Sequence, residues 1–578
     1  MGLFVFHRAR GLRAARRAHC CRAVALVVVC LGAAQAHAYD LIFSSGFEQV
    51  ADAPTSDAEA ARFLTMATFG PTPASIAQLR SVGYGQWIDQ QLSMPTTPER
   101  PYVQALDAGV KNPGQADRME AWFANAVTAP DQLRQRAAWA LSQIMVASDQ
   151  LGNLPEDPIT LAEYNDILAR DAFGWYDTGN QYHAGTYYNL LYDVSHSPAM
   201  GKMLTFIRNS KPNPVTGYSP DENYAREVMQ LFSIGLIERN LDFSPQLDGG
   251  GQPIPTYTQA TITANARVLT GLSYQSGWNS NPTGLNWSAA DYLPLVCYEA
   301  YHDEGQKIVL DNQVVPGGAN RCAPDIADLL QIIASHKNVA PFIARQLIER
   351  FTSSNPTPAY IQRVAEVFLN NGQGVYGDLG AVVKAVLTDP EAAYNAPPPP
   401  SPYVFGKARE PLLKLTALWR YYAAAAQNGL YSFNYPQGNY AQRPLGAPSV
   451  FNFYLPDYLP PGEMAQAGQY GPEFQVLNES SVVSTANDLT NRVNAYVGNP
   501  ANTSATIAVD LSGLVALASN PTALVAQLNH DLLYGSMSSQ MNTILVNLVT
   551  ALPASNPTAR VTGALQVLLA SPEYAIQK

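Results

Sequence analysis

The chain has 578 residues, of which 47% are hydrophobic and 14% charged, and its formal net charge at pH 7 is −11. The hydrophobic content supplies ample core, and the length is that of about three domains of roughly 150 residues each. An acidic chain repels phosphate backbones and anionic lipids, and no stripe of Lys or Arg follows the N-terminal segment. The composition therefore argues against binding to nucleic acid or a membrane surface, and it favours a cationic or neutral partner.

The N-terminus has the pattern of a secretory signal peptide. Six arginines precede an apolar run over residues 23–34, and the small-residue motif Ala36-His37-Ala38 follows directly. The run is too short to span a bilayer comfortably, so we expect a Sec-type signal over residues 1–38, cleaved after Ala38, and no integral span afterwards. Cleavage removes six positive charges and no acidic residue, which takes the net charge from −11 to −17 on 540 residues. The expected location is periplasmic or secreted.

After a flexible lead-in over residues 39–57, apolar residues recur at steps of three and four through most of the chain. This is the period of amphipathic helices, and strand-like alternation is scarce. The pattern predicts helices in the first part of the chain over residues 57–68, 73–92, 116–128, 158–170, 196–208, 219–236, 259–270, 324–335, 339–352 and 357–370.

A Pro-rich run at residues 395–402 cannot be helical and is the best internal boundary. It separates an N-terminal helical region, 58–394, from a C-terminal helical region, 403–578, that we expect to pack on the first. In the second region we expect a long helix over residues 407–427, ordered loops over residues 429–472 and further helices over residues 473–574. The predicted fold is mainly α, a large multi-helix body with long ordered loops and a few short strands or hairpins.

The segment from Ser219 to Leu236 predicts an amphipathic helix. Ser219 is placed to cap it, Pro220 to occupy its first position and Glu222 to reach back to the cap. The polar stripe of this helix is either a solvated face, with Glu222 paired to Arg226, or a polar network facing a cleft, with Arg267 as one partner. The stripe consists of Asn223, Arg226, Glu227 and Gln230.

The sequence Glu222-Asn-Tyr-Ala-Arg-Glu227, followed by Tyr257-Thr-Gln259, resembles the signature of a bacterial family known as domain of unknown function 1800. The resemblance runs over nearly the whole mature chain. It implies an exported, mostly helical protein without an assigned activity, and a secreted protein partner. Many members place His where Phe232 stands and Asp where Thr261 stands, so a site that needs that His is not expected here.

The mature chain keeps only two cysteines, Cys297 and Cys322. An even pair in an oxidising compartment predicts one disulfide, and the alternative is two buried thiols. A disulfide here would close a loop of 26 residues, which is worth roughly 3–4 kcal/mol on the chain-entropy model.

The segment Tyr301-His-Asp-Glu-Gly-Gln-Lys307 resembles the H-D-x-x-x-K segment of the same family. His302 and Asp303 are suited to ligate a metal or to act as an acid/base pair, because imidazole titrates near neutrality and a carboxylate tunes it. Alternatively, His302 donates a structural hydrogen bond that pins the loop, and Lys307 pairs with Asp303 across a hairpin.

His336 lies just before a predicted helix that Asn338 is placed to cap. The imidazole is either a capping or packing residue, or it holds an anion or joins His302 at a metal.

Two functions from different classes fit the sequence. One is an exported helical binding or scaffold protein, and the other is an exported metal- or carboxylate-dependent hydrolase-like enzyme. The mature chain has no H-E-x-x-H, G-x-S-x-G or P-loop motif, and the sequence identifies no cofactor, metal or small-molecule substrate. The catalytic candidates are Glu222, Arg226, Glu227, His302 and Asp303. The binding candidates are Asn223, Arg267, Lys307 and His336. The enzyme hypothesis requires Glu222, Arg226, His302 and His336 to converge in one cleft.

Overall fold

The computed structural model describes residues 52–108, 112–152, 154–177, 179–278, 292–392, 406–495 and 507–577. They belong to one compact unit that begins at Asp52. The predicted signal peptide, most of the predicted lead-in and the Pro-rich run at 395–402 lie outside the described residues.

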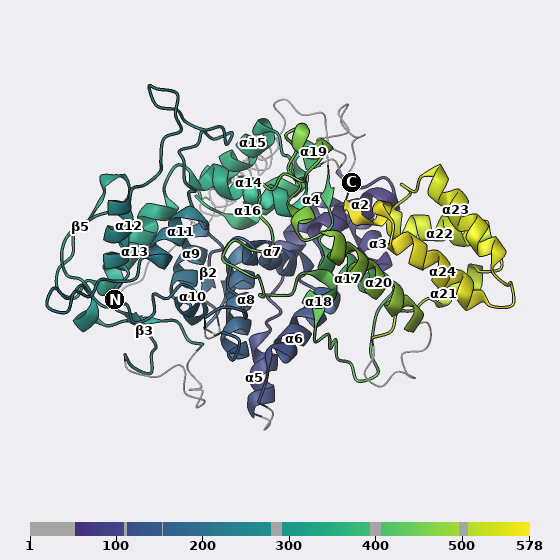
Figure 1. Ribbon diagram of the computed structural model, residues 1–578, viewed down its shortest axis with the longest axis horizontal. Coiled ribbons are helices and arrows are strands. Elements are labelled where there is room, and N and C mark those ends of the chain that lie inside the picture. The colour runs from purple at the N-terminus through teal and green to yellow at the C-terminus, as the bar shows by residue number, and fades with distance from the viewer. Residues whose placement is uncertain are drawn as a thin grey trace, which may run out of the picture. The chain divides into compact units, whose positions relative to one another are not determined.

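The fold is mainly α, which confirms the predicted class. Figure 1 shows helices over most of the described chain, with α22, α23 and α24 side by side in yellow. The helices before the Pro-rich run are α2 (Asp57–Ala67), α3 (Pro73–Val82), α4 (Tyr84–Ser93), α5 (Arg100–Ala108), α6 (Gln115–Thr128), α7 (Gln132–Ser142), α8 (Pro158–Phe173), α9 (Tyr187–Ser195), α10 (Pro198–Met203), α11 (Asn223–Gln230), α12 (Gln259–Val268), α13 (Cys322–Ala334), α14 (Val339–Phe351), α15 (Pro358–Leu369) and α16 (Leu379–Thr388). Those after it are α17 (Pro411–Tyr421), α18 (Pro436–Tyr440), α19 (Glu463–Gln466), α20 (Glu479–Ala495), α21 (Ser512–Leu517), α22 (Pro521–Leu533), α23 (Ser539–Ala551), α24 (Pro557–Leu569) and α25 (Pro572–Ala575).

The strands of the described chain are two residues long and pair as antiparallel two-stranded sheets. Short 3₁₀ helices accompany them: η1 (Glu299–Tyr301), η2 (Leu310–Asn312), η3 (Pro390–Ala392) and η4 (Pro472–Gln475). The pairs are β1 (Trp175–Tyr176) with β2 (Tyr182–His183), β3 (Leu272–Ser273) with β4 (Val296–Cys297), β5 (Lys307–Ile308) with β6 (Val314–Val315), and β7 (Lys407–Ala408) with β8 (Ile576–Gln577).

The single helix predicted over residues 73–92 is two helices, because Gly83 separates α3 from α4. Gly83 has φ 82°, and its N–H donates to the Leu79 carbonyl oxygen at 2.8 Å to end α3. A Cβ at this position would lie 2.5 Å from the carbonyl oxygen of Asp52, so only glycine fits.

The prediction that a capping box at Ser219 starts the signature helix was wrong. Helix α11 begins at Asn223, whose N–H is capped by Asp221 Oδ1 at 2.8 Å, and Glu222 makes no capping hydrogen bond. The preceding residues are held instead by Asn209, which donates to the Asp221 carbonyl at 2.9 Å and accepts from its N–H at 3.1 Å. This contact between distant segments outweighs the local capping preference.

Two other predicted helices are shorter in the structure. The segment 196–208 contains only α10, which Ser197 caps and which ends before Thr205, a residue with φ 57°. The segment 407–427 contains α17, which begins at Pro411, because residues before a proline favour extended backbone and residues 407–408 pair as strand β7.

The hydrophobic core contains residues from both sides of the Pro-rich run, among them Trp139 and Trp419. Helix α17 lies so close to Gly70 that a Cβ there would be 2.4 Å from the Cα of Ala417. The buried Arg420 guanidinium donates to the Gly70 carbonyl oxygen at 2.6 Å and to the Val127 carbonyl oxygen at 2.7 Å. These bonds join α17 to the chain after α2 and to the end of α6.

The disulfide predicted between Cys297 and Cys322 is present, with a Cα–Cα distance of 5.9 Å. It links strand β4 to the first residue of α13. We predict that the double variant Cys297→Ala/Cys322→Ala lowers the free energy of unfolding by about 3–4 kcal/mol, because the unfolded chain regains the entropy of an open loop. Urea denaturation measures this loss, and the wild type under reducing conditions should show the same one. A variant as stable as the oxidised wild type would contradict the prediction.

Candidate functional site

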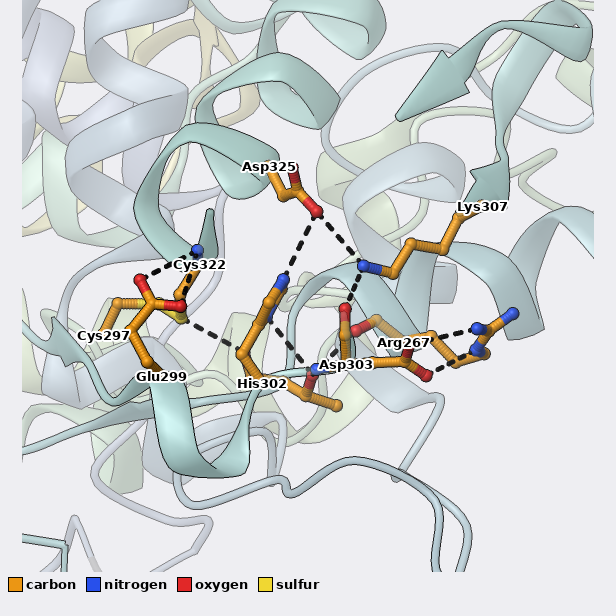
Figure 2. Close-up of a disulfide and its surroundings, with 9 residues drawn as sticks. Arg267, Cys297, Glu299, His302, Asp303, Lys307, Cys322 and Asp325 are labelled. Carbon is orange, nitrogen blue, oxygen red and sulfur yellow. Dashed lines mark hydrogen bonds and ion pairs between the residues drawn. A yellow bond between two sulfur atoms is a disulfide. The ribbon is translucent and has the colours of Figure 1, made fainter. Parts of the chain in front are cut away.

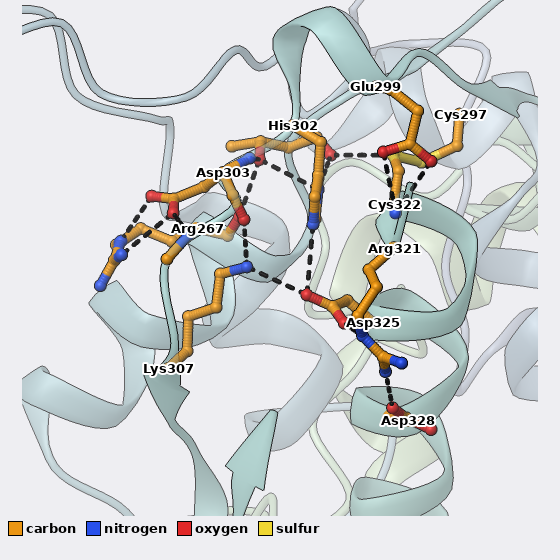
Figure 3. Close-up of polar contacts among 12 residues, drawn as sticks. Arg267, Cys297, Glu299, His302, Asp303, Lys307, Arg321, Cys322, Asp325 and Asp328 are labelled. Atoms are coloured by element: carbon orange, nitrogen blue, oxygen red, sulfur yellow. Dashed lines mark hydrogen bonds and ion pairs between the residues drawn. A yellow bond between two sulfur atoms is a disulfide. The ribbon is translucent and has the colours of Figure 1, made fainter. Parts of the chain in front are cut away.

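A buried carboxylate, that of Asp325, joins three segments next to the disulfide. Its Oδ2 accepts a hydrogen bond from Lys307 Nζ at 3.1 Å and lies 3.4 Å from His302 Nε2. Its Oδ1 accepts from Arg321 Nε at 2.7 Å. Figure 2 shows the carboxylate facing both His302 and Lys307, whose side chains are fully buried. Figure 3 shows Arg321 on the other side of Asp325, reaching on to Asp328.

Arg267 and Asp303 form a second ion pair in the same network. Arg267 Nε and Nη2 donate to the two carboxylate oxygens of Asp303 at 2.7 and 3.0 Å. The Gly305 N–H donates to Asp303 Oδ1 at 2.8 Å, and the Asp303 N–H donates to Thr270 Oγ1 at 2.9 Å. The Lys307 ammonium donates to the carbonyl oxygen of Asp303. The predicted contact between Lys307 and Asp303 is therefore made through the backbone, while the carboxylate pairs with Arg267.

This arrangement supports the structural interpretation of His302. Its Nδ1 donates to the Thr270 carbonyl oxygen at 2.8 Å, and its ring is fully buried. Burial raises the pKa of the Asp303 and Asp325 carboxyls, but other interactions outweigh it and leave both pKa values below the usual range. For Asp303 these are hydrogen bonds from Arg267 and the Gly305 N–H, and for Asp325 they are hydrogen bonds from Arg321, Lys307 and His302. An acid/base pair must reach its substrate, whereas these groups are occupied by protein partners.

The two segments of the family signature meet on a partly exposed polar surface. Glu222 accepts hydrogen bonds from Gln259 Nε2 at 2.7 Å and from Thr263 Oγ1 at 2.6 Å. Arg226 Nη2 lies 3.8 Å from Glu222 Oε2, which is the predicted pair four residues apart. Asn223 is exposed beside them. We call Glu222, Asn223, Arg226, Gln259 and Thr263 the signature surface.

Glu227 differs from its neighbours on the polar stripe, because it is buried. Its Oε2 makes no hydrogen bond, and burial raises the pKa of its carboxyl against the opposing charge of Arg226. Gln230, the last residue of the stripe, accepts from Tyr257 Oη at 3.4 Å. The stripe is therefore solvated at the start of α11 and buried toward its middle.

His336 lies in a third group, with Glu238 and Asp311. Its Nε2 is 3.5 Å from Asp311 Oδ2 and 3.8 Å from Glu238 Oε1. Burial lowers the pKa of the imidazole, and the two carboxylates oppose this effect. The Asn338 side chain does not cap α14 as predicted, because its Oδ1 accepts a hydrogen bond from the Arg239 N–H at 3.0 Å. Its Nδ2 donates to the carbonyl oxygens of Ile234 and Ile237 at 3.0 and 2.8 Å.

The predicted site residues thus fall into three groups. Arg267, His302, Asp303 and Lys307 share one network. Glu222 and Arg226 form an ion pair with exposed Asn223 beside them, and His336 lies with Glu238 and Asp311. Across the described residues, no hydrogen bond or ion pair joins Glu222 or Arg226 to His302 or to His336. The assignment of these side chains as catalytic or binding residues stays a prediction.

A family model described as "Protein of unknown function (DUF1800)" matches residues 62–576. The chain belongs to this family. No curated protein and no solved structure gives a match. The match confirms the resemblance to DUF1800 that the signature segments indicate, and it names no reaction. Over the described part of the chain, no helix combines the length and apolar content that crossing a bilayer requires.

Sequence reasoning missed four residues that matter in these groups: Asp325, Arg321, Glu238 and Asp311. The sequence gives a weak indication of Asp325 alone, because it is an acidic residue in the first turn of α13, where a negative charge interacts favourably with the helix dipole. Glu238 and Asp311 belong to irregular segments without a periodic pattern, and no motif of the DUF1800 resemblance includes them.

We predict that Asp325→Asn lowers the free energy of unfolding by about 3–5 kcal/mol, because it leaves the buried Lys307 ammonium without its counter-charge. Asp328→Asn is the matched control. It lies on the same helix and also pairs with Arg321, but its side chain is 50% exposed, so a loss of less than about 1 kcal/mol is expected. Chemical denaturation of both variants measures the difference, and equal losses would show that burial does not set the strength of this network.

Proposed function

We propose that this DUF1800 protein is an exported binding protein whose signature surface contacts a secreted protein partner. The single observation that carries the proposal is that both signature segments meet through hydrogen bonds to Glu222 at a partly exposed position. Exposed hydrogen bonds and ion pairs add little to stability, so the fold does not need this arrangement. Ordered polar groups at a surface are suited to recognition.

The contrast with His302 and Asp303 favours binding over the hydrolase-like alternative. Those two side chains are taken up by Thr270, Asp325 and Arg267 inside the protein. The signature surface, by comparison, offers amide, guanidinium and carboxylate groups to solvent. With the net charge of −17 expected after signal removal, the partner we propose is cationic or neutral, since an acidic partner would be repelled.

Export is part of the proposal and rests on the N-terminal arginines, the short apolar run and Ala36-His37-Ala38. The disulfide supports it, because disulfides persist in oxidising compartments. We predict that the mature protein recovered from outside the cytoplasm begins at Tyr39. N-terminal sequencing and intact mass measure this, and a chain that keeps residues 1–38 would contradict the assignment.

Binding is tested by placing a photo-crosslinking amino acid at Asn223, with the exposed Gln540 on α23 as the control position. In exporting cells we expect one defined adduct from position 223 and none from position 540. Glu222→Ala/Arg226→Ala should abolish the adduct while changing the free energy of unfolding by no more than about 1 kcal/mol. Equal adducts from both positions, no adduct, or an adduct that survives the double substitution would overturn the proposal.

A further inference from the structure

Three side chains of types that can ligate a metal lie close together beside the start of α14, although they come from distant parts of the chain. Glu238 follows α11, Asp311 lies in the turn between β5 and β6, and His336 lies between α13 and α14. One ligand atom from each lies within 4.8 Å of the other two. The group contains no residue of the signature surface, so a ligand site here is independent of the proposed function.

The imidazole of His336 points an unsatisfied nitrogen into this group. The residue is 3% exposed, and its Nε2 makes no hydrogen bond. The distances of 3.5 Å to Asp311 Oδ2 and 3.8 Å to Glu238 Oε1 are too long for one. A buried polar atom without a partner is rare enough in native proteins to require an explanation. A cation between the three side chains supplies one.

We propose that Glu238, Asp311 and His336 bind a divalent transition-metal cation of the Zn²⁺ class. One imidazole nitrogen and two carboxylate oxygens form a mixed donor set that suits such ions. Metal–ligand bonds of about 2.0–2.1 Å in tetrahedral geometry hold the ligand atoms about 3.3–3.4 Å apart. The distance from Nε2 to Asp311 Oδ2, 3.5 Å, is close to this value, and that from Nε2 to Glu238 Oε1, 3.8 Å, is slightly longer.

The surroundings of the carboxylates fit the same role. The Glu238 backbone is fixed on both sides, since its N–H donates to the Ile254 carbonyl and its carbonyl accepts from the Gln246 N–H, each at 2.8 Å. Lys337 Nζ lies 3.2 Å from Glu238 Oε2, which leaves Oε1 to face the imidazole. The Asp311 side chain is 51% exposed, so the ion can enter from solvent and a water can take the fourth position.

Binding has a local cost at the imidazole. Nδ1 of His336 accepts a hydrogen bond from the Asn338 N–H at 3.1 Å, so the proton of the neutral ring is on Nε2. Coordination through Nε2 moves that proton to Nδ1 and gives up the contact with Asn338. One backbone hydrogen bond is thus exchanged for three bonds to the cation, and no net proton is released from a neutral ring.

The test is calorimetric titration of the purified protein, freed of metal with a chelator, with ZnCl₂ and in a separate arm with MgCl₂. We expect one Zn²⁺ per chain and weaker binding of Mg²⁺. Asp311→Asn should weaken Zn²⁺ binding by at least about tenfold, because loss of a ligand should exceed the effect of losing an outer-shell partner. Asparagine tolerates the left-handed conformation of Asp311, φ 55°, so this variant should keep its fold.

Glu304→Gln is the matched control, since Glu304 is exposed and precedes β5 but lies outside the cluster. It should bind Zn²⁺ as the wild type does, and at the same Zn²⁺ concentration the Tm of both should rise by more than that of Asp311→Asn. Absence of Zn²⁺ binding in the wild type, unchanged binding in Asp311→Asn, or an equal loss in Glu304→Gln would each overturn the site.

Discussion

The carboxylate of Asp325 imposes the tightest constraint on the irregular region between α12 and α14. A buried ion costs several kcal/mol in lost hydration unless its partners are close and well oriented. Asp325 meets that requirement through Lys307 on β5 and Arg321 at the start of α13, with His302 beside it. The β5–β6 hairpin and α13 therefore cannot shift separately without leaving charge unpaired.

That constraint also affects the positions of Asp311 and His336, two of the three residues in the proposed metal site. Asp311 lies at the tip of the hairpin that Lys307 begins, and His336 follows the helix that contains Asp325. Locking the hairpin to the helix through one buried carboxylate therefore also sets how far Asp311 lies from His336. In this sense the H-D-x-x-x-K segment, whose His302, Asp303 and Lys307 side chains are held by protein partners, supports the proposed site formed by other residues. The disulfide fixes the start of the same helix to a different segment, because it joins Cys297 of β4 to Cys322, the first residue of α13.

The same principle orders the long loop after α17. The buried Glu410 carboxylate accepts hydrogen bonds from Trp139 Nε1 and Gln442 Nε2, both at 3.0 Å. Arg118 donates to the carbonyl oxygen of Pro444 at 2.8 Å, and its guanidinium pairs with Asp149. Apolar periodicity predicts none of these contacts, because each joins residues far apart in sequence. The helices α2, α6, α8, α12, α14 and α15 were predicted well, since their apolar faces repeat locally. The capping box at Ser219 was not, because Asn209, a distant residue, holds that segment.

The candidate residues show why a motif and a site are different things. Asp303 and Lys307 belong to a recognisable segment, yet their side chains are buried and hydrogen-bonded to protein groups. Glu238 and Asp311 belong to no motif, yet they face a buried nitrogen that has no hydrogen-bond partner. A ligand can bind where the fold leaves a buried polar group without a partner. The new contact offsets the free energy that burying the unpaired group costs. Spacing in a sequence cannot reveal that capacity, because it depends on which distant groups the fold brings within reach.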